Sequence, residues 1–154
     1  MNAAQPARYV VRIAVRSYEM DVNGHVNHAV YHQYAEHARM EHIRATGLTQ
    51  HALAEHGLTV VLLSTTVHFR AELRHGEEID VDSEIAFSDR KPFTMRHRIV
   101  RVADGDGAPA NHLAAEAECT MGVLDTTTRR LVADPFGRLA AAATTPELLG
   151  AGPS

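Results

Sequence analysis

The sequence contains one cysteine, one lysine, no tryptophan and no long apolar run. A single cysteine excludes a disulfide within the chain. Cys119 belongs to the alternating series Ala117, Cys119, Met121 and Val123, so we interpret it as a small buried hydrophobe on a strand rather than a nucleophile. No stretch approaches the roughly 20 apolar residues of a membrane-spanning helix. The N-terminus also lacks the charged and apolar regions of a signal peptide. We therefore expect a cytoplasmic protein with no membrane span.

Clustered positive charge is also missing. The 154 residues carry a formal net charge of −4, and runs of like charge do not extend beyond adjacent pairs. Binding to nucleic acid needs a clustered basic patch, so we expect no nucleic-acid partner. Hydrophobic residues make up 45% of the chain, which is typical of an ordinary globular protein. The length predicts one domain, which we place at residues 1–145, with a flexible C-terminal tail at residues 146–154.

Two kinds of hydrophobic periodicity divide the chain. Near-helical spacing predicts one long helix over residues 28–46, with Asn27 as its N-cap and Gly47 just beyond its end. Alternation of apolar and polar residues predicts strands before and after this helix. The remaining expected elements are strands at 8–16, 58–73, 78–87, 93–102 and 112–124, a short last strand at 129–132, short helices at 49–56 and 136–143, and a turn at 104–107. One long helix against one antiparallel sheet is an α+β arrangement.

The long helix has an apolar stripe that identifies its buried face. Tyr31, Tyr34 and Ala38 follow the helical spacing, and we expect the tyrosines to belong to the core. The stripe is interrupted by His42, which we expect to be solvated or at an interface. Arg39 is expected to lie on the opposite, polar side with most of the helix's other charges.

The densest polar chemistry lies in the loop that leads into this helix. Asp21 places a carboxylate beside a helix N-terminus, where backbone N–H groups lack partners within the helix and favour negative charge. A carbonyl group bound there would be polarised and its oxyanion stabilised. Asp21 can then attack the carbonyl carbon or activate water, while Asn23 and His25 orient that water or carry a proton. The alternative is structural, because Asp21, Asn23 and Asn27 are also common turn and cap residues, and Gly24 is most simply a turn glycine.

This segment resembles the hotdog-fold thioesterases of the 4-hydroxybenzoyl-CoA thioesterase superfamily. The pattern Asp-x-x-Gly-His-Val-Asn-x-x-x-Tyr starts at Asp21, and a Glu-x-x-Arg pair follows at Glu36. The resemblance implies that Asp21 is catalytic and that the backbone N–H of His28 forms the oxyanion site. The YbgC-like branch also has a histidine at the position of His28. That branch often has tyrosine four residues before the aspartate, whereas Ser17 stands here.

A second, local resemblance is to the plant acyl-ACP thioesterases. It implies functional roles for Asn23 and His25 beside Asp21, and it makes Glu72, in Phe69-Arg70-Ala71-Glu72, a counterpart of that branch's glutamate. Gly24 departs from this branch, which has glutamine at that position.

Together the resemblances imply a hotdog fold, an antiparallel sheet wrapped around one long helix. They imply hydrolysis of an acyl-CoA or acyl-ACP to free acid and thiol, without a cofactor, by a homodimer or homotetramer whose active sites lie at subunit interfaces. Tyr31 would line the acyl pocket in part. The turn with Arg90 and Lys91 would contact the phosphates or pantetheine of coenzyme A, and a solvated loop is the alternative interpretation of that turn. No metal site is expected, since nothing completes a ligand set around His28 and His32.

Two other functions remain open at this point. Hotdog enoyl-thioester hydratases have a motif similar to Asp-x-Asn-Pro-x-His, but here Gly24 replaces the proline and His25 comes one residue early. A non-catalytic acyl-binding module is the other alternative.

Overall fold

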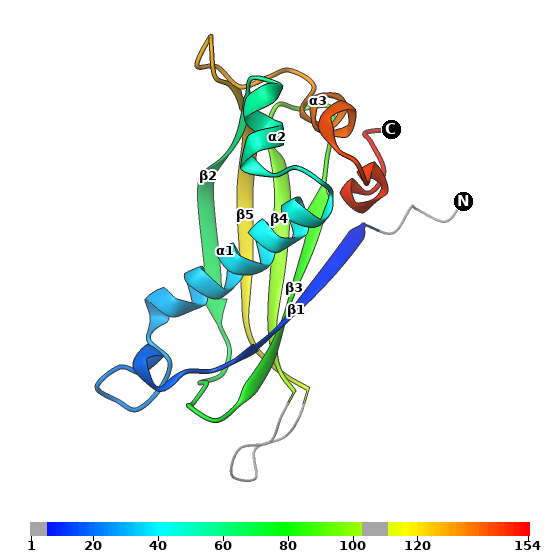
Figure 1. Cartoon of the computed structure of the whole chain (residues 1–154). Helices are drawn as coiled ribbons and strands as arrows, with labels where there is room; N and C mark the ends of the chain where they lie inside the picture. Colours follow the sequence, from blue (N-terminus) through cyan, green and yellow to red (C-terminus); the bar gives the residue numbers. More distant parts are fainter. Residues whose placement is uncertain (1–5, 103–110) are drawn as a thin grey trace.

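One long helix lies across a curved, five-stranded antiparallel sheet (Figure 1). The computed structural model describes residues 6–102 and 111–154. The strands follow the order β1-β3-β4-β5-β2, so β1 and β2 form the two edges. Their bounds are β1 Ala7–Ala14, β2 Leu58–Phe69, β3 Glu78–Ala86, β4 Phe93–Arg101 and β5 His112–Asp125. The helices are α1 His28–Ala45, α2 Gln50–Glu55 and α3 Pro135–Ala142, with 3-10 turns η1 Ser17–Glu19 and η2 Pro146–Leu149.

Local sequence sets both ends of α1. The side chain of Asn27 accepts a hydrogen bond from the backbone N–H of Ala29, as expected of an N-cap. Gly47 has a φ of +90°, the left-handed conformation that commonly ends a helix. Both predicted boundaries of the long helix are therefore confirmed.

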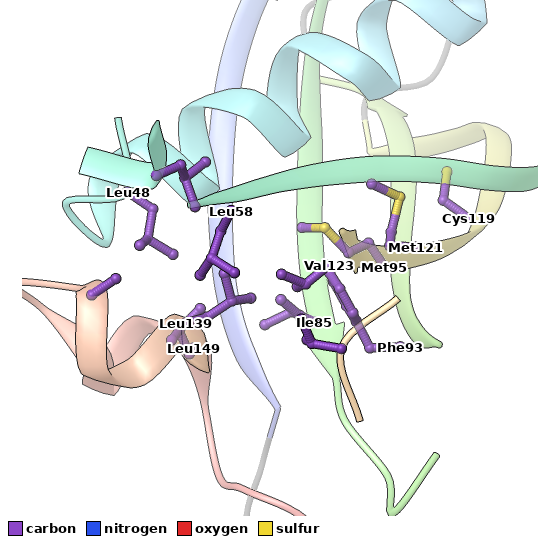
Figure 2. Packing of buried hydrophobic residues seen from close by; sticks show 13 residues of the cluster. Leu48, Leu58, Ile85, Phe93, Met95, Cys119, Met121, Val123, Leu139 and Leu149 are labelled. Atoms are coloured by element: carbon purple, nitrogen blue, oxygen red, sulfur yellow. The ribbon is translucent and has the colours of Figure 1, made fainter. Parts of the chain in front are cut away.

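The apolar core is divided into two clusters along the length of α1. The lower cluster, beneath the N-terminal half of the helix, includes Tyr31, Tyr34 and Ala38, so the predicted core role of both tyrosines is confirmed. Figure 2 shows the upper cluster, where Leu139 and Leu149 from the C-terminal segment pack near β-strand residues. Cys119 is 2% exposed within this upper cluster, as predicted for a small buried hydrophobe.

A layer of buried polar side chains lies on the middle of the sheet beneath α1. His42 is 1% exposed, and its Nε2–H donates to the carbonyl oxygen of Leu148 (2.8 Å). Burial lowers the pKa of His42, so the ring is neutral and its Nδ1 accepts from the hydroxyl of Ser83 (2.9 Å). Arg39 and His97 are also buried. The predictions of a solvated or interfacial His42 and an outward-facing Arg39 are therefore wrong.

The C-terminal segment also differs from the prediction. Residues 146–154 were expected to be a flexible tail, but Pro146–Leu149 form η2 and Leu149 is 1% exposed in the upper cluster. The short strand expected at 129–132 is reduced to one bridge between Leu124 and Leu131. The turn expected at 104–107 lies outside the described residues. Within residues 6–102 and 111–154, no helix combines the length and apolarity needed to cross a bilayer.

Candidate active site

A tight loop presents Asp21 immediately before α1. The backbone N–H of Asp21 donates to the carbonyl of His25 (2.7 Å), and a bridge between Met20 and Val26 closes the base of the loop. Gly24 turns the chain at a φ of +75°. One carboxylate oxygen of Asp21 accepts from the backbone N–H groups of Asn23 (2.8 Å) and His25 (3.4 Å). These bonds orient the carboxylate, so the turn and the candidate catalytic group are parts of the same local structure.

The N–H groups at the start of α1 differ in whether the described chain supplies them with an acceptor. Asn27 caps the N–H of Ala29 at 2.9 Å, and the N–H of Val30 bonds to the carbonyl of Asn27 (2.9 Å). Across the described part of the chain, no acceptor is found for the N–H of His28. This donor stands at the positive end of an 18-residue helix, where a developing negative charge is stabilised.

His25 belongs to a charged cluster with two residues from the segment after β2. Its Nε2 lies 2.7 Å from Oε2 of Glu72, and Nη2 of Arg74 donates to Oε1 of the same carboxylate at 2.7 Å. The hydrogen bond from Arg74 lowers the pKa of Glu72, and the nearby His25 lowers it further. Glu72 is therefore a carboxylate that holds His25 beside the Asp21 loop.

These groups surround an open hollow of about 360 Å³. Tyr31 forms part of its wall, with its hydroxyl donating to the carbonyl of Ala71 (3.3 Å), and burial raises the pKa of this phenol. Phe69 meets Tyr31 edge to face at 5.1 Å but remains 52% exposed. The hollow is lined by Asp21, His25, Val26, His28, Tyr31, Phe69, Arg70, Ala71 and Glu72.

The structure therefore brings together five of the eight residues that the sequence analysis selected: Asp21, His25, His28, Tyr31 and Glu72. Asn23 lies exposed at the tip of the turn, where it donates its backbone N–H to Asp21. Arg90 and Lys91 are exposed in the turn between β3 and β4. This turn is at the end of the sheet opposite the loop that leads into α1 (Figure 1). Within one chain, the two residues do not share the hollow.

The sequence analysis missed two supporting residues. Glu19 is 6% exposed and lies two positions before Asp21; its side chain accepts hydrogen bonds from Tyr34 (2.9 Å) and from the backbone N–H of Arg16 (2.7 Å). The other missed residue is Arg74, which pairs with Glu72. A glutamate in a loop is expected to be solvated, so no sequence signal pointed to Glu19.

The described residues around Asp21 do not form a set of metal ligands. Among the described residues, no group of three or more histidine, cysteine, aspartate or glutamate side chains is arranged to hold a metal ion. His28 and His32, which share a helical spacing suited to metal binding, are both exposed.

Comparison with known proteins gives the same fold. A chloroplastic acyl-acyl carrier protein thioesterase of Arabidopsis thaliana is 30% identical over 92 residues, 60% of this chain and 48% of the relative. The chain thus spans about half the length of that relative. A hypothetical protein of Thermus thermophilus is 28% identical with a TM-score of 0.70, covering 86% of this chain and 95% of that one. The 4-hydroxybenzoyl CoA thioesterase of Pseudomonas sp. strain CBS-3 is 18% identical with a TM-score of 0.75, covering 86% and 97%.

These neighbours confirm the predicted hotdog fold, a sheet wrapped around one long helix. The family model of the thioesterase-like superfamily matches residues 15–149, a span that includes the Asp21 loop, α1 and four of the five strands in full. The chain belongs to the thioesterase-like superfamily.

Proposed function

We propose that this protein hydrolyses an acyl thioester to a free carboxylic acid and a thiol. The observation that carries the proposal is the pairing of the oriented Asp21 carboxylate with the uncommitted N–H of His28 in one hollow. Acyl transfer needs a nucleophile or base to attack the carbonyl and a donor to stabilise the oxyanion, and these two groups would supply both.

The proposed reaction begins with the thioester carbonyl oxygen on the His28 N–H. Asp21 either attacks the carbonyl carbon, giving an anhydride that water then cleaves, or removes a proton from a water that attacks directly. In both routes the C–S bond breaks, water supplies the OH group of the acid, and the remaining proton of that water passes to the leaving thiolate, which becomes the thiol. His25, held by Glu72 at 2.7 Å, is placed to position water or pass that proton. Asn23 acts through its backbone, by orienting Asp21.

The proposed substrate carrier is coenzyme A or acyl carrier protein. The name of the plant relative supports a carrier protein, and the name of the Pseudomonas enzyme supports coenzyme A. Arg90 and Lys91 remain proposed contacts for the carrier's phosphates, supplied by a second copy of the chain, since the β3–β4 turn that carries them is at the other end of the sheet from the Asp21 loop of their own copy.

We further propose that the working unit is at least a homodimer joined along β2. This strand is one edge of the sheet, and its Leu62 and Leu63 are 46% and 47% exposed. An unpaired edge with exposed apolar side chains favours pairing with another strand. Two-fold pairing of β2 with itself would place the Leu58 end of one copy beside the Phe69 end of the other. The Asp21 hollow, which Phe69 lines, would then be closed by the second copy.

A panel of acyl-CoA and acyl-ACP thioesters, assayed with a thiol-detecting reagent, tests the function. We expect thiol release by the wild-type protein and a loss of about 1000-fold in kcat for Asp21→Asn. The asparagine retains an oxygen that can accept from the backbone of residues 23 and 25, so the loop should keep its shape. Glu147→Gln, at an exposed carboxylate of η2, is the matched control and should keep full activity.

Crotonyl-CoA separates hydrolysis from hydration. Release of free thiol supports the proposal, whereas loss of the enoyl absorbance without thiol release identifies a hydratase. Thermal stabilisation by acyl-CoA without any turnover identifies a binding module. Undiminished turnover by Asp21→Asn refutes the role of Asp21.

A further inference from the structure

We propose that Arg39 binds a carboxylate carried by the acyl group of the substrate, which makes the protein selective for acyl thioesters with a second, remote acidic group. The proposal rests on the proposed thioester hydrolysis and names the substrate class for it.

Arg39 is a buried cation without a carboxylate. Its side chain is 7% exposed, and its Nη1 donates to Sγ of Cys119 at 3.5 Å. In residues 6–102 and 111–154, no aspartate or glutamate oxygen lies within 4.0 Å of its guanidinium. Arg101 is equally buried, at 7%, and lies 3.7 Å from Glu77. The comparison shows that the described part of the chain supplies an acid to one buried arginine and none to the other.

The surroundings of Arg39 on the sheet do not compensate its charge. A thiol is a weak acceptor, and Thr65, which also contacts Cys119 at 3.5 Å, offers only a hydroxyl. His97 is 0% exposed; burial, followed by the charge of Arg39, lowers its pKa to about 4, so it is neutral near pH 7. Charges buried in proteins are nearly always paired, because an unpaired one loses its hydration without replacement. Within the described residues of one copy nothing supplies a full negative charge to Arg39, so an anion from outside that copy would complete the pairing.

A groove of about 560 Å³ gives a ligand access to Arg39. It lies between α1, α2 and β2, and its volume is within the range of small-molecule sites. Its walls are mainly apolar, and they are formed by Ile43, Leu48, Leu53, Val60, Leu62 and Met121. The other charged groups at the groove are Glu36, Glu41 and Arg44, of which Glu41 and Arg44 pair with each other at 3.5 Å. A chain of methylene groups fits the walls, and a terminal carboxylate fits the guanidinium, which offers a fork of donors for two oxygens.

The position of the groove relates it to the Asp21 site. Within one copy, the groove lies along the C-terminal half of α1, whereas Asp21 precedes its N-terminus. The two-fold pairing of β2 proposed above would place the groove of one copy beside the Asp21 hollow of the other. An acyl chain with its thioester at Asp21 of one copy would then extend into the groove toward Arg39 of the second copy.

Two thioesters of equal chain length test the proposal: adipoyl-CoA, which has a terminal carboxylate, and hexanoyl-CoA, which does not. We expect the wild-type protein to prefer adipoyl-CoA in kcat/KM. Arg39→Met, which keeps length and apolar bulk, should lower kcat/KM for adipoyl-CoA by about 10- to 100-fold and change that for hexanoyl-CoA less than threefold. Arg39→Lys keeps the charge but loses the forked pair of donors, so its kcat/KM for adipoyl-CoA should lie between those of the wild-type protein and Arg39→Met. An equal loss on both substrates overturns the proposal, because it indicates a structural role.

A binding measurement separates this proposal from the proposed function. Free adipate should raise the Tm of the wild-type protein more than hexanoate does, and this difference should vanish in Arg39→Met. If no thioester is hydrolysed but the adipate effect depends on Arg39, the hydrolase function fails and the carboxylate site stands. If the wild-type protein hydrolyses thioesters without preference for adipoyl-CoA, and adipate does not raise its Tm more than hexanoate does, the Arg39 proposal alone fails. Both measurements use the wild-type protein, so they decide the question even if Arg39→Met does not fold.

The competing source of the anion is a carboxylate of a second copy, such as its Glu36. Sedimentation velocity distinguishes the two sources. If the Arg39→Met variant sediments as a smaller species than the wild-type protein, the arginine serves subunit association and the substrate-binding proposal is overturned. An unchanged sedimentation coefficient together with the loss of adipoyl preference supports it.

Discussion

The hydroxyl of Tyr34 donates a 2.9 Å hydrogen bond to the buried carboxylate of Glu19. Tyr34 belongs to α1, and Glu19 ends the 3-10 turn that leads into the Asp21 loop. The backbone carbonyl of Glu19 also accepts from the N–H of Asn27, the N-cap of α1, at 2.9 Å. The loop that carries the Asp21 carboxylate and the helix whose first N–H is the proposed oxyanion donor are thus fixed to each other.

Tyr34→Phe tests whether this connection matters for turnover. Burial, and then the bond to Glu19, raise the pKa of Tyr34, so the phenol keeps its proton and acts as a donor at working pH. Its loss leaves a buried carboxylate with fewer donors, and we expect about 1–2 kcal/mol less stability. We also expect kcat to fall about 10-fold with KM nearly unchanged, because Asp21 loses its position relative to His28. Urea unfolding and steady-state kinetics measure both, and Tyr18→Phe, at a tyrosine that is 80% exposed, should change neither. A full kcat in Tyr34→Phe would show that the loop does not need this bond.

Leu63→Lys tests the proposed dimer edge. A charged side chain at this exposed position of β2 should prevent strand pairing between copies, so we expect a shift from dimer to monomer in sedimentation velocity, with most thioesterase activity lost. Val10→Lys on β1, the other edge strand, is the control, since Val10 is also 47% exposed. A monomeric wild-type protein, or a dimeric and active Leu63→Lys variant, would contradict the assignment of β2.

Acid should destabilise the fold through His97. Its folded pKa of about 4 lies below the ordinary value of 6.5, so between these values the unfolded chain binds a proton that the folded chain does not. Unfolding free energy should therefore fall as the pH drops through this window, by about 3 kcal/mol for His97. The lowered pKa of His42 acts in the same direction. Urea unfolding at pH 7 and pH 4 measures the total change, and His97→Asn should reduce it; an identical pH dependence in that variant would count against His97.

Gly47→Ala should be more damaging than Gly24→Ala. Both glycines have positive φ, +90° and +75°, where an added side chain costs roughly 1–2 kcal/mol. A Cβ on Gly47 would in addition collide with the hydroxyl of Thr144 and lie 2.9 Å from its backbone nitrogen, whereas one on Gly24 would meet nothing within 4 Å. We expect about 1 kcal/mol of lost stability at Gly24 and at least 2 kcal/mol at Gly47. Equal losses in urea unfolding would mean that Thr144 moves aside at little cost.

The sequence predicted what depends on neighbouring residues. Asn27 and Gly47 mark the ends of α1 because caps act over a few positions, and alternation located the strands because their side chains face one way every second residue. His42 could not be placed in this way. Its partners are 41 and 106 residues away in the chain, and the spacing of its own helix gives no information about them.

The residues of the candidate site also divide into those that are close in the sequence and those that only the folded sheet brings together. Asp21, His25 and His28 form one local segment, so their proximity could be anticipated from the motif. The pairing of Glu72 with Arg74 and the burial of Arg39 depend on which strands lie beside α1, and therefore on the completed sheet.

The polar layer beneath α1 has one more consequence, for the axial position of the helix. Apolar contacts hold α1 through the fit of its side chains alone. The polar layer adds a specific constraint, because a shift of α1 by one turn would separate His42 from both Ser83 and the carbonyl of Leu148. The hydrogen bonds of this layer therefore fix the axial position of α1 along the sheet. The helix is continuous from His42 back to His28, about four turns away. The axial position of α1 therefore also determines where its first N–H lies relative to Asp21.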